Sequence, residues 1–173
     1  MANSRRLQRE LPLDHMTTLP EDNPYLDLRD MALSATAESL GLELSNNAEA
    51  FGVVIDVAVQ GGSATFTAFR SGDASMYTSA GGGMIGGGSH EKVSEAAVAL
   101  VEKAGEAIPR LTPTADTALP LPNRVRFYVL TNGAKFFVED SDENFFTAEG
   151  KFADLFLAAN NLITELRQVD EDK

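Results

Sequence analysis

The stretch FGVVIDVAVQGGSATFTAFR, residues 51–70, decides the fold because it has the pattern of two strands joined by a tight turn. Apolar residues recur at every second position on both sides of Gly61-Gly62, which is the period of a strand with one buried face. A Gly-Gly pair tolerates the positive φ angles that two-residue hairpin turns need. Counting outward from this pair predicts four facing pairs: Val59 with Ala64, Val57 with Phe66, Ile55 with Ala68, and Val53 with Arg70.

A helix precedes this hairpin, and a third strand follows it. Asn23 and Pro24 are typical of a helix start and Gly41 of a helix end, which predicts a helix over residues 24–40. The tight turn of residues 71–74 leads into ASMYTS, residues 74–79, which predicts a strand with Tyr77 on the same face as Ala68. The apolar face of the helix carries Leu28, Met31, Ala32, Ala35 and Leu40.

The second half of the chain also combines a hairpin with helices. Helical spacing of apolar residues predicts helices over residues 89–107 and 151–168. Between them, Asn132-Gly133 is the strongest short-range signal for a hairpin, and residues 145–147 predict a short extra strand. Outward counting from Asn132-Gly133 predicts these pairs: Val129 with Phe136, Tyr128 with Phe137, Phe127 with Val138, and Arg126 with Glu139.

Together these elements predict one α+β domain over residues 23–168. We expect an antiparallel sheet of five or six strands with three helices, in the order α-β-β-β-α-β-β-(β)-α. The proline-rich residues 109–123 form an ordered crossover within this domain, because each half looks too small to close its own core. Residues 1–22 are expected to form a flexible arm, and residues 169–173 a free tail.

Composition narrows the function classes. The 173 residues include no cysteine, which excludes disulfides and thiol chemistry and suits a reducing cytoplasm. The net charge of -12 repels phosphate backbones and anionic lipid, so we expect neither a nucleic-acid nor a membrane partner. No apolar run has the length of about 18 residues that a membrane span needs.

The densest cluster of glycine lies in TSAGGGMIGGGSHEKV, residues 78–93. The amides of Gly86, Gly87, Gly88 and Ser89 could point at a small anion at the start of the next helix, with His90 in its first turn. Hydrolysis would require Ser79 or Ser89 beside His90. Residues 81–86 also satisfy G-x-G-x-x-G, but the strand before them belongs to an antiparallel meander, so no dinucleotide cofactor is expected.

Met84 and Ile85 stand at the centre of the glycine tract. Two apolar residues in such a tract suit either a tuck into the core or an adaptable contact with a partner protein. A purely structural joint is the third interpretation, because glycine imposes little on the backbone.

Metal chemistry finds no support in the sequence. Asp140-Ser141-Asp142-Glu143-Asn144 begins like a calcium loop, but Phe145 and Lys151 occupy positions that need Gly and Glu. Only His15 and His90 are present, and they are far apart, so no histidine-based metal site is expected.

The sequence therefore predicts a small acidic cytoplasmic protein that binds a partner protein or a second copy of itself and has no catalytic chemistry or cofactor. An accessory, regulatory or immunity-type protein of a bacterium fits its size and charge. The alternative is a ligand-binding or hydrolytic protein that uses the anion site at residues 86–90.

Overall fold

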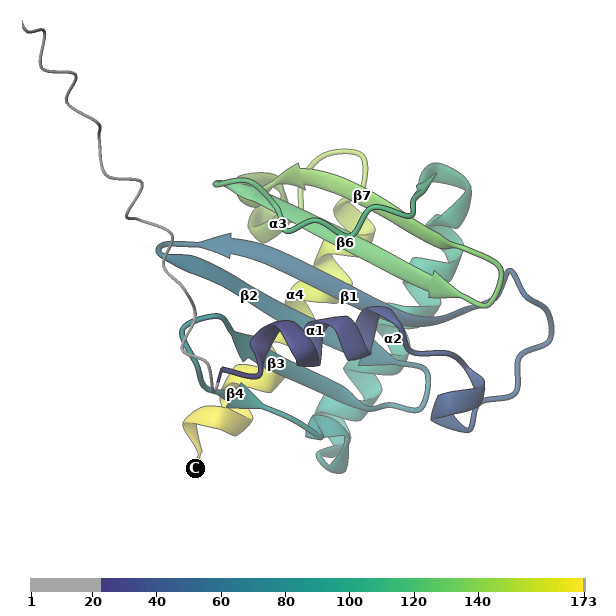
Figure 1. The fold of residues 1–173 in the computed structure, drawn as a ribbon, viewed down its shortest axis with the longest axis horizontal. Helices are drawn as coiled ribbons and strands as arrows, with labels where there is room; N and C mark the ends of the chain where they lie inside the picture. Colours follow the sequence, from purple (N-terminus) through teal and green to yellow (C-terminus); the bar gives the residue numbers. More distant parts are fainter. Residues whose placement is uncertain (1–22, 173) are drawn as a thin grey trace, which may run out of the picture.

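A seven-stranded antiparallel sheet separates two helical layers in the computed structural model, which describes residues 23–172 (Figure 1). The strands lie in the order β4-β3-β2-β1-β6-β7-β5. Their bounds are β1 Ala50–Val59, β2 Gly62–Phe69, β3 Ala74–Thr78, β4 Gly83–Met84, β5 Thr112–Pro113, β6 Arg124–Thr131 and β7 Lys135–Ser141. The predicted α+β class and antiparallel sheet are confirmed.

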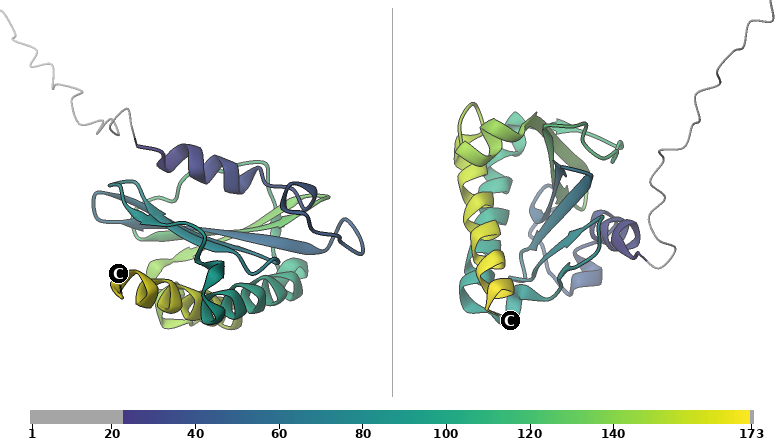
Figure 2. Two further views of the ribbon diagram at one scale, coloured as in Figure 1. Left: turned by 90° about the horizontal axis from the view of Figure 1, so that it is seen from below. Right: turned by 90° about the vertical axis from the view of Figure 1, so that its left-hand side faces the viewer.

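The two faces of the sheet are covered unequally. One face carries α1, Tyr25–Leu33, while the other carries α2, Glu91–Ala107, and α4, Ala153–Glu171 (Figure 2). The short helix α3, Asp142–Thr147, packs beside α4. Three 3-10 turns complete the described chain: η1 Glu38–Leu40, η2 Gly87–Ser89 and η3 Ile108–Arg110. The sheet has more strands than expected. The sequence pattern does not reveal β4 and β5, because each is only two residues long.

The first hairpin pairs two residues away from the predicted register. Val59 faces Gly62 rather than Ala64, and Ile55 faces Phe66 rather than Ala68. Only Gly61 of the glycine pair takes a positive φ, 80°, so Gln60-Gly61 makes the turn and Gly62 already belongs to β2. Because the register is shifted by an even number of residues, every side chain still lies on the predicted face of the sheet.

The second hairpin has the predicted register throughout. Val129 faces Phe136, Tyr128 faces Phe137, Phe127 faces Val138, and Arg126 faces Glu139. The pair of Arg126 and Glu139 is also an ion pair, with 2.6 Å between Nε and Oε2.

The first helix is shorter than predicted. It ends at Leu33 instead of residue 40, and the chain turns again at η1. Thr36 and Ser39 explain this break: the Ser39 amide donates to the Thr36 hydroxyl, and the Ser39 hydroxyl donates to the Thr36 carbonyl. Such local bonds compete with helical ones. Gly41 ends η1 with a φ of 67°.

Two further predictions near the C-terminus are wrong. Residues 145–147 lie in α3 rather than in a strand, because the Ser141 hydroxyl accepts the Asn144 amide and caps a helix there. The final helix continues to Glu171, so the predicted free tail is helical over residues 169–171, with Val169 packed against the core. The predicted arm, residues 1–22, and Lys173 lie outside the described residues.

Two apolar clusters lie on the two faces of the sheet. The larger fills the space between the sheet and helices α2 and α4, around Phe127, Leu100 and Leu162. The smaller lies beneath α1 and contains Ala32, Leu33, Ala37, Phe51, Val54, Phe69, Tyr128 and Leu130. The α1 face therefore has the thinner apolar cover.

Candidate functional site: an apolar groove beside α1

The glycine tract separates its two apolar residues. Gly83 and Met84 form β4 at the edge of the sheet, with Met84 opposite Met76. Met84 is 4% exposed and belongs to the larger core cluster, whereas Ile85 is 66% exposed. In this structure Met84 is tucked into the core, and Ile85 alone is available for a surface contact.

Close packing explains why three of these positions are glycine. A Cβ on Gly83 would lie 2.2 Å from the Met76 carbonyl oxygen, and one on Gly88 would lie 2.7 Å from that of Gly72. At Gly87 a Cβ would lie 3.0 Å from Leu166 Cδ2. This part of the tract is a packed connection between the sheet edge and α2.

The predicted anion-binding residues do not form the start of α2. That helix begins at Glu91, while Gly87, Gly88 and Ser89 form η2. The Gly86 amide donates to the Ser75 hydroxyl, and the His90 side chain makes no hydrogen bond to Ser79 or Ser89 within the described chain. No Ser–His contact that hydrolysis would need is therefore formed among residues 23–172, and anion binding at residues 86–90 stays a prediction.

A buried ion pair fastens α1 to the sheet. The Arg29 guanidinium donates to Asp56 Oδ2 from Nε at 3.0 Å and from Nη2 at 2.7 Å, and Nη2 also donates to the Thr117 carbonyl. Burial acts to lower the pKa of Arg29, but the hydrogen bonds to Asp56, the charge of Asp56 and smaller effects of Tyr128 and Tyr25 together raise it. Arg29 therefore connects the helix, β1 and the proline-rich crossover.

Hydroxyl groups extend this anchor. The Thr65 hydroxyl donates to Asp56 Oδ1 at 2.7 Å, so the Tyr25 hydroxyl, 2.8 Å from Thr65 Oγ1, must donate to Thr65. The Tyr77 hydroxyl donates to the Leu28 carbonyl. Every buried side-chain nitrogen and oxygen among residues 23–172 has a partner, which indicates an anchor for α1 rather than a polar ligand site.

An open groove of about 530 Å³ lies between α1 and the strands β2 and β3. None of its lining residues is charged: Leu28, Met31, Ala32, Ser34, Ala35, Ser39, Leu40, Thr67, Phe69, Ser75, Tyr77 and Ile85. Met31 and Ile85, on its two sides, are 69% and 66% exposed. The volume is within the usual range for ligand sites, but the lining is apolar apart from hydroxyl groups.

One wall of the groove is formed by the residues that the sequence marks as the apolar face of the first helix. Leu28, Met31 and Ala32 of α1 line it, together with Ala35 and Leu40 from the segment that follows α1. Tyr25, Arg29 and Leu33 take the side facing the sheet, where the polar anchor holds them. Because the anchor includes charged and hydroxyl groups, hydrophobic periodicity alone does not reveal which face is buried.

Tyr77 closes the floor of the groove and corrects one sequence expectation. It pairs with Thr65 in the sheet, whereas Ala68 pairs with Ala74, so Tyr77 and Ala68 lie on opposite faces. The Tyr77 ring also meets Tyr25 edge to face, with 6.0 Å between centroids. Sequence reasoning missed the groove because it depends on a single helix covering only part of one sheet face.

Within the described range, no three His, Asp or Glu side chains gather to hold a metal ion. No helix over residues 23–172 is long and apolar enough to cross a membrane. No family model matches the chain, and no curated protein or solved structure matches it significantly.

Proposed function

We propose that this chain is a non-enzymatic protein-binding domain whose groove beside α1 receives an apolar segment of a partner protein. The observation that carries this proposal is the exposure of Met31 and Ile85 on the two sides of an uncharged groove. Large apolar side chains gathered around a concave surface are typical of protein interaction sites.

The polar groups of the groove favour a protein segment over a polar small molecule. The Ser75 hydroxyl accepts the Gly86 amide, the Ser39 hydroxyl bonds to Thr36, and the Tyr77 hydroxyl donates to Leu28. These three hydroxyl groups already have partners, so among the polar side chains of the lining only those of Ser34 and Thr67 are left to orient a polar ligand. An occupant would gain its affinity mainly by burying apolar surface.

Site-specific photo-crosslinking in the source cells tests the proposal. A photoreactive residue at position 31 or 85 should capture the partner, whereas one at Leu157 should not. Leu157 is a matched control because it is 55% exposed and lies in α4, on the other side of the sheet.

Capture must then be confirmed with the purified partner. Met31→Ser with Ile85→Ser should weaken binding at least tenfold, because each truncation removes apolar contact worth roughly 1.5–3 kcal/mol when fully buried. Leu157→Ser should leave the affinity unchanged. Equal affinities for the groove variant and the wild type would refute the proposal.

A further inference from the structure

Acidic residues stand close in the chain to residues that line the uncharged groove. Asp27 lies one helical turn before Met31, so the two share a face of α1. Glu38 directly precedes the groove residue Ser39, and Asp73 directly precedes β3, two residues before the groove residue Ser75. All three acids are exposed. An occupant of the groove would therefore pass close to negative charge at several points.

Among residues 23–172, the basic side chains that could neutralise these acids lie elsewhere. Within residues 23–172, no Lys or Arg forms an ion pair with Asp27, Glu38 or Asp73. Arg29 is buried against Asp56, and Arg70 pairs with Glu49. The remaining basic residues of the described range lie in or beside α2 and α4, or in β6 and β7: Lys92, Lys103, Arg110, Arg124, Arg126, Lys135, Lys151 and Arg167.

The same charges disfavour a second copy as the occupant. The chain has a net charge of -12. A two-fold dimer through the groove would place the same acidic rim of each copy against the other, which raises the electrostatic cost of association. A partner of opposite charge removes this cost and is also steered toward the groove.

We propose that the occupant of the groove is a segment of a partner protein in which Lys or Arg residues flank apolar side chains. The apolar side chains enter the groove between Met31 and Ile85, and the basic ones meet Asp27 and Glu38 at its rim. This inference rests on the proposed protein-binding function and adds the chemistry of the partner.

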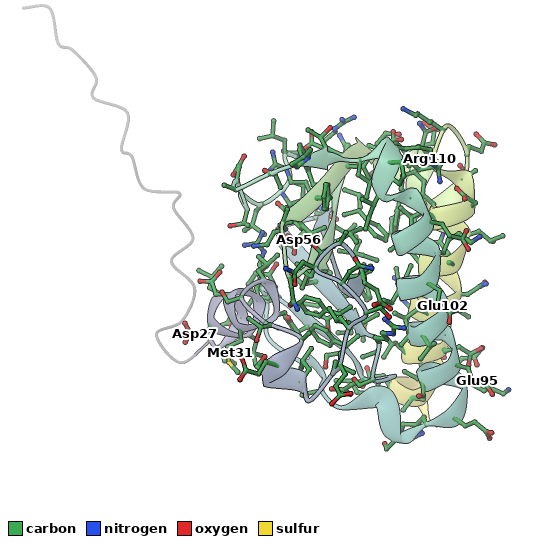
Figure 3. All side chains as sticks on the ribbon, turned by 90° about the vertical axis from the view of Figure 1, so that its right-hand side faces the viewer. Asp27, Met31, Asp56, Glu95, Glu102 and Arg110 are labelled. Atoms are coloured by element: carbon green, nitrogen blue, oxygen red, sulfur yellow. The ribbon has the colours of Figure 1, made fainter. Side chains whose placement is uncertain are left out.

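Two synthetic peptides and two double variants test it. The peptides are an amphipathic Leu/Lys peptide and a Leu/Glu peptide of identical spacing. The rim variant is Asp27→Lys with Glu38→Lys, and the control is Glu95→Lys with Glu102→Lys in α2. Figure 3 shows Asp27 and Met31 together on α1, and Glu95 and Glu102 on the opposite side of the molecule. Both double variants change the net charge by the same amount. The difference between their affinities for a peptide therefore reports the effect of the charges at the rim.

Fluorescence anisotropy should show the wild type binding the Leu/Lys peptide at least tenfold more tightly than the Leu/Glu peptide. The rim variant should lose at least fivefold in affinity for the Leu/Lys peptide and become less sensitive to salt, while the control changes less than twofold. Met31→Ser with Ile85→Ser should weaken the binding of this peptide as well. Circular dichroism and thermal unfolding verify that each variant is folded.

Four results would overturn the inference. Equal losses of affinity in the rim and control variants would mean that the net charge of the protein, and not the rim of the groove, attracts the Leu/Lys peptide. Equal binding of both peptides, with the Met31/Ile85 variant still weakened, would remove the charge preference but leave the proposed function standing. Self-association of the wild type that the Met31/Ile85 variant abolishes would identify a second copy. Tighter peptide binding by Arg5→Gln, Arg6→Gln, Arg9→Gln would identify the chain's own N-terminal residues as the occupant.

Discussion

The Nη2 atom of Arg29 lies 2.7 Å from Oδ2 of Asp56, and solvent reaches only 5% and 0% of the two side chains. The pair joins a helix that covers one sheet face to the central strand β1. It therefore sets which side of α1 faces the sheet, and in doing so turns the apolar side toward the groove.

Arg29→Met should destabilise the protein strongly, because it leaves the carboxylate of Asp56 buried without its cation. Breaking such a pair costs about 3–5 kcal/mol. Urea unfolding measures the change in free energy, and Arg29→Met with Asp56→Asn should recover part of the loss. Lys103→Met is the control, since Lys103 makes an ion pair of the same length with Glu106 on the surface. A loss for Arg29→Met no larger than the control would contradict the anchoring role.

Gly83→Ala should cost more stability than Gly82→Ala. Both glycines have a positive φ, 145° and 85°, so an added side chain is strained at either position. At Gly82 nothing lies within 4 Å of the new Cβ, and the cost should be about 1–2 kcal/mol. At Gly83 the Cβ would also meet the Met76 carbonyl oxygen at 2.2 Å. Urea unfolding of both variants checks the order, and a reversed order would show that β4 does not pack against β3 as described.

Glu139→Gln should make stability less dependent on pH in acid. Arg126, and after it Arg124, donates to this carboxylate and holds its pKa below the ordinary 4.5. The stabilisation is therefore complete above about pH 4.5 and is lost as the pH falls through the lower pKa of the folded state. Because the side chain is 25% exposed, the effect should be about 0.2–1 kcal/mol. Unfolding free energies at neutral pH and near pH 3 measure it.

The control for this acid dependence is Glu143→Gln, which removes a carboxylate that belongs to no ion pair of the described chain. The acid dependence of this variant is compared with that of Glu139→Gln, so that the effect of the ion pair is separated from the effect of removing an exposed carboxylate. An identical pH profile for Glu139→Gln and the wild type would show that the ion pair adds no stability.

Tyr77→Phe should make the protein less sensitive to alkali. Burial, with a smaller effect of Asp56, raises the pKa of Tyr77 above the ordinary 10.0. The stabilisation by the neutral phenol is therefore complete below about pH 10 and is lost as the pH rises toward the folded-state pKa. At neutral pH the variant should lose roughly 0.5–1.5 kcal/mol, because the bond to the Leu28 carbonyl disappears. Denaturant unfolding across the alkaline range, followed by circular dichroism, measures both effects. An alkaline profile identical to that of the wild type would contradict the burial of Tyr77.

The two hairpins show how far local chemistry predicts register. Asn132-Gly133 places β6 against β7 as expected, because the turn and the alternation of side chains agree. At the first hairpin, two adjacent glycines allow more than one turn. The observed turn places Gly62 in β2, where a Cβ would lie 2.1 Å from the Ser79 hydroxyl oxygen, and Ser79 lies directly after β3, outside the hairpin.

The candidate site was predicted less well than the fold. Ile85 was identified and lies on the surface, but Met84, Gly87 and Gly88 occupy places that packing explains. The apolar face of α1 was also identified, although its exposure was not foreseen. Which face of α1 is buried depends on Tyr25 and Arg29, whose partners Thr65 and Asp56 are remote in sequence.

The sequence by itself determined the class of the fold, the positions of the main strands and helices, and the second hairpin's register, because alternation, helical spacing and turn residues act over short distances. The tertiary structure decided the first hairpin's register, the core position of Met84, and the groove. These features arise where segments far apart in the chain meet, so their energies depend on contacts that no local pattern contains.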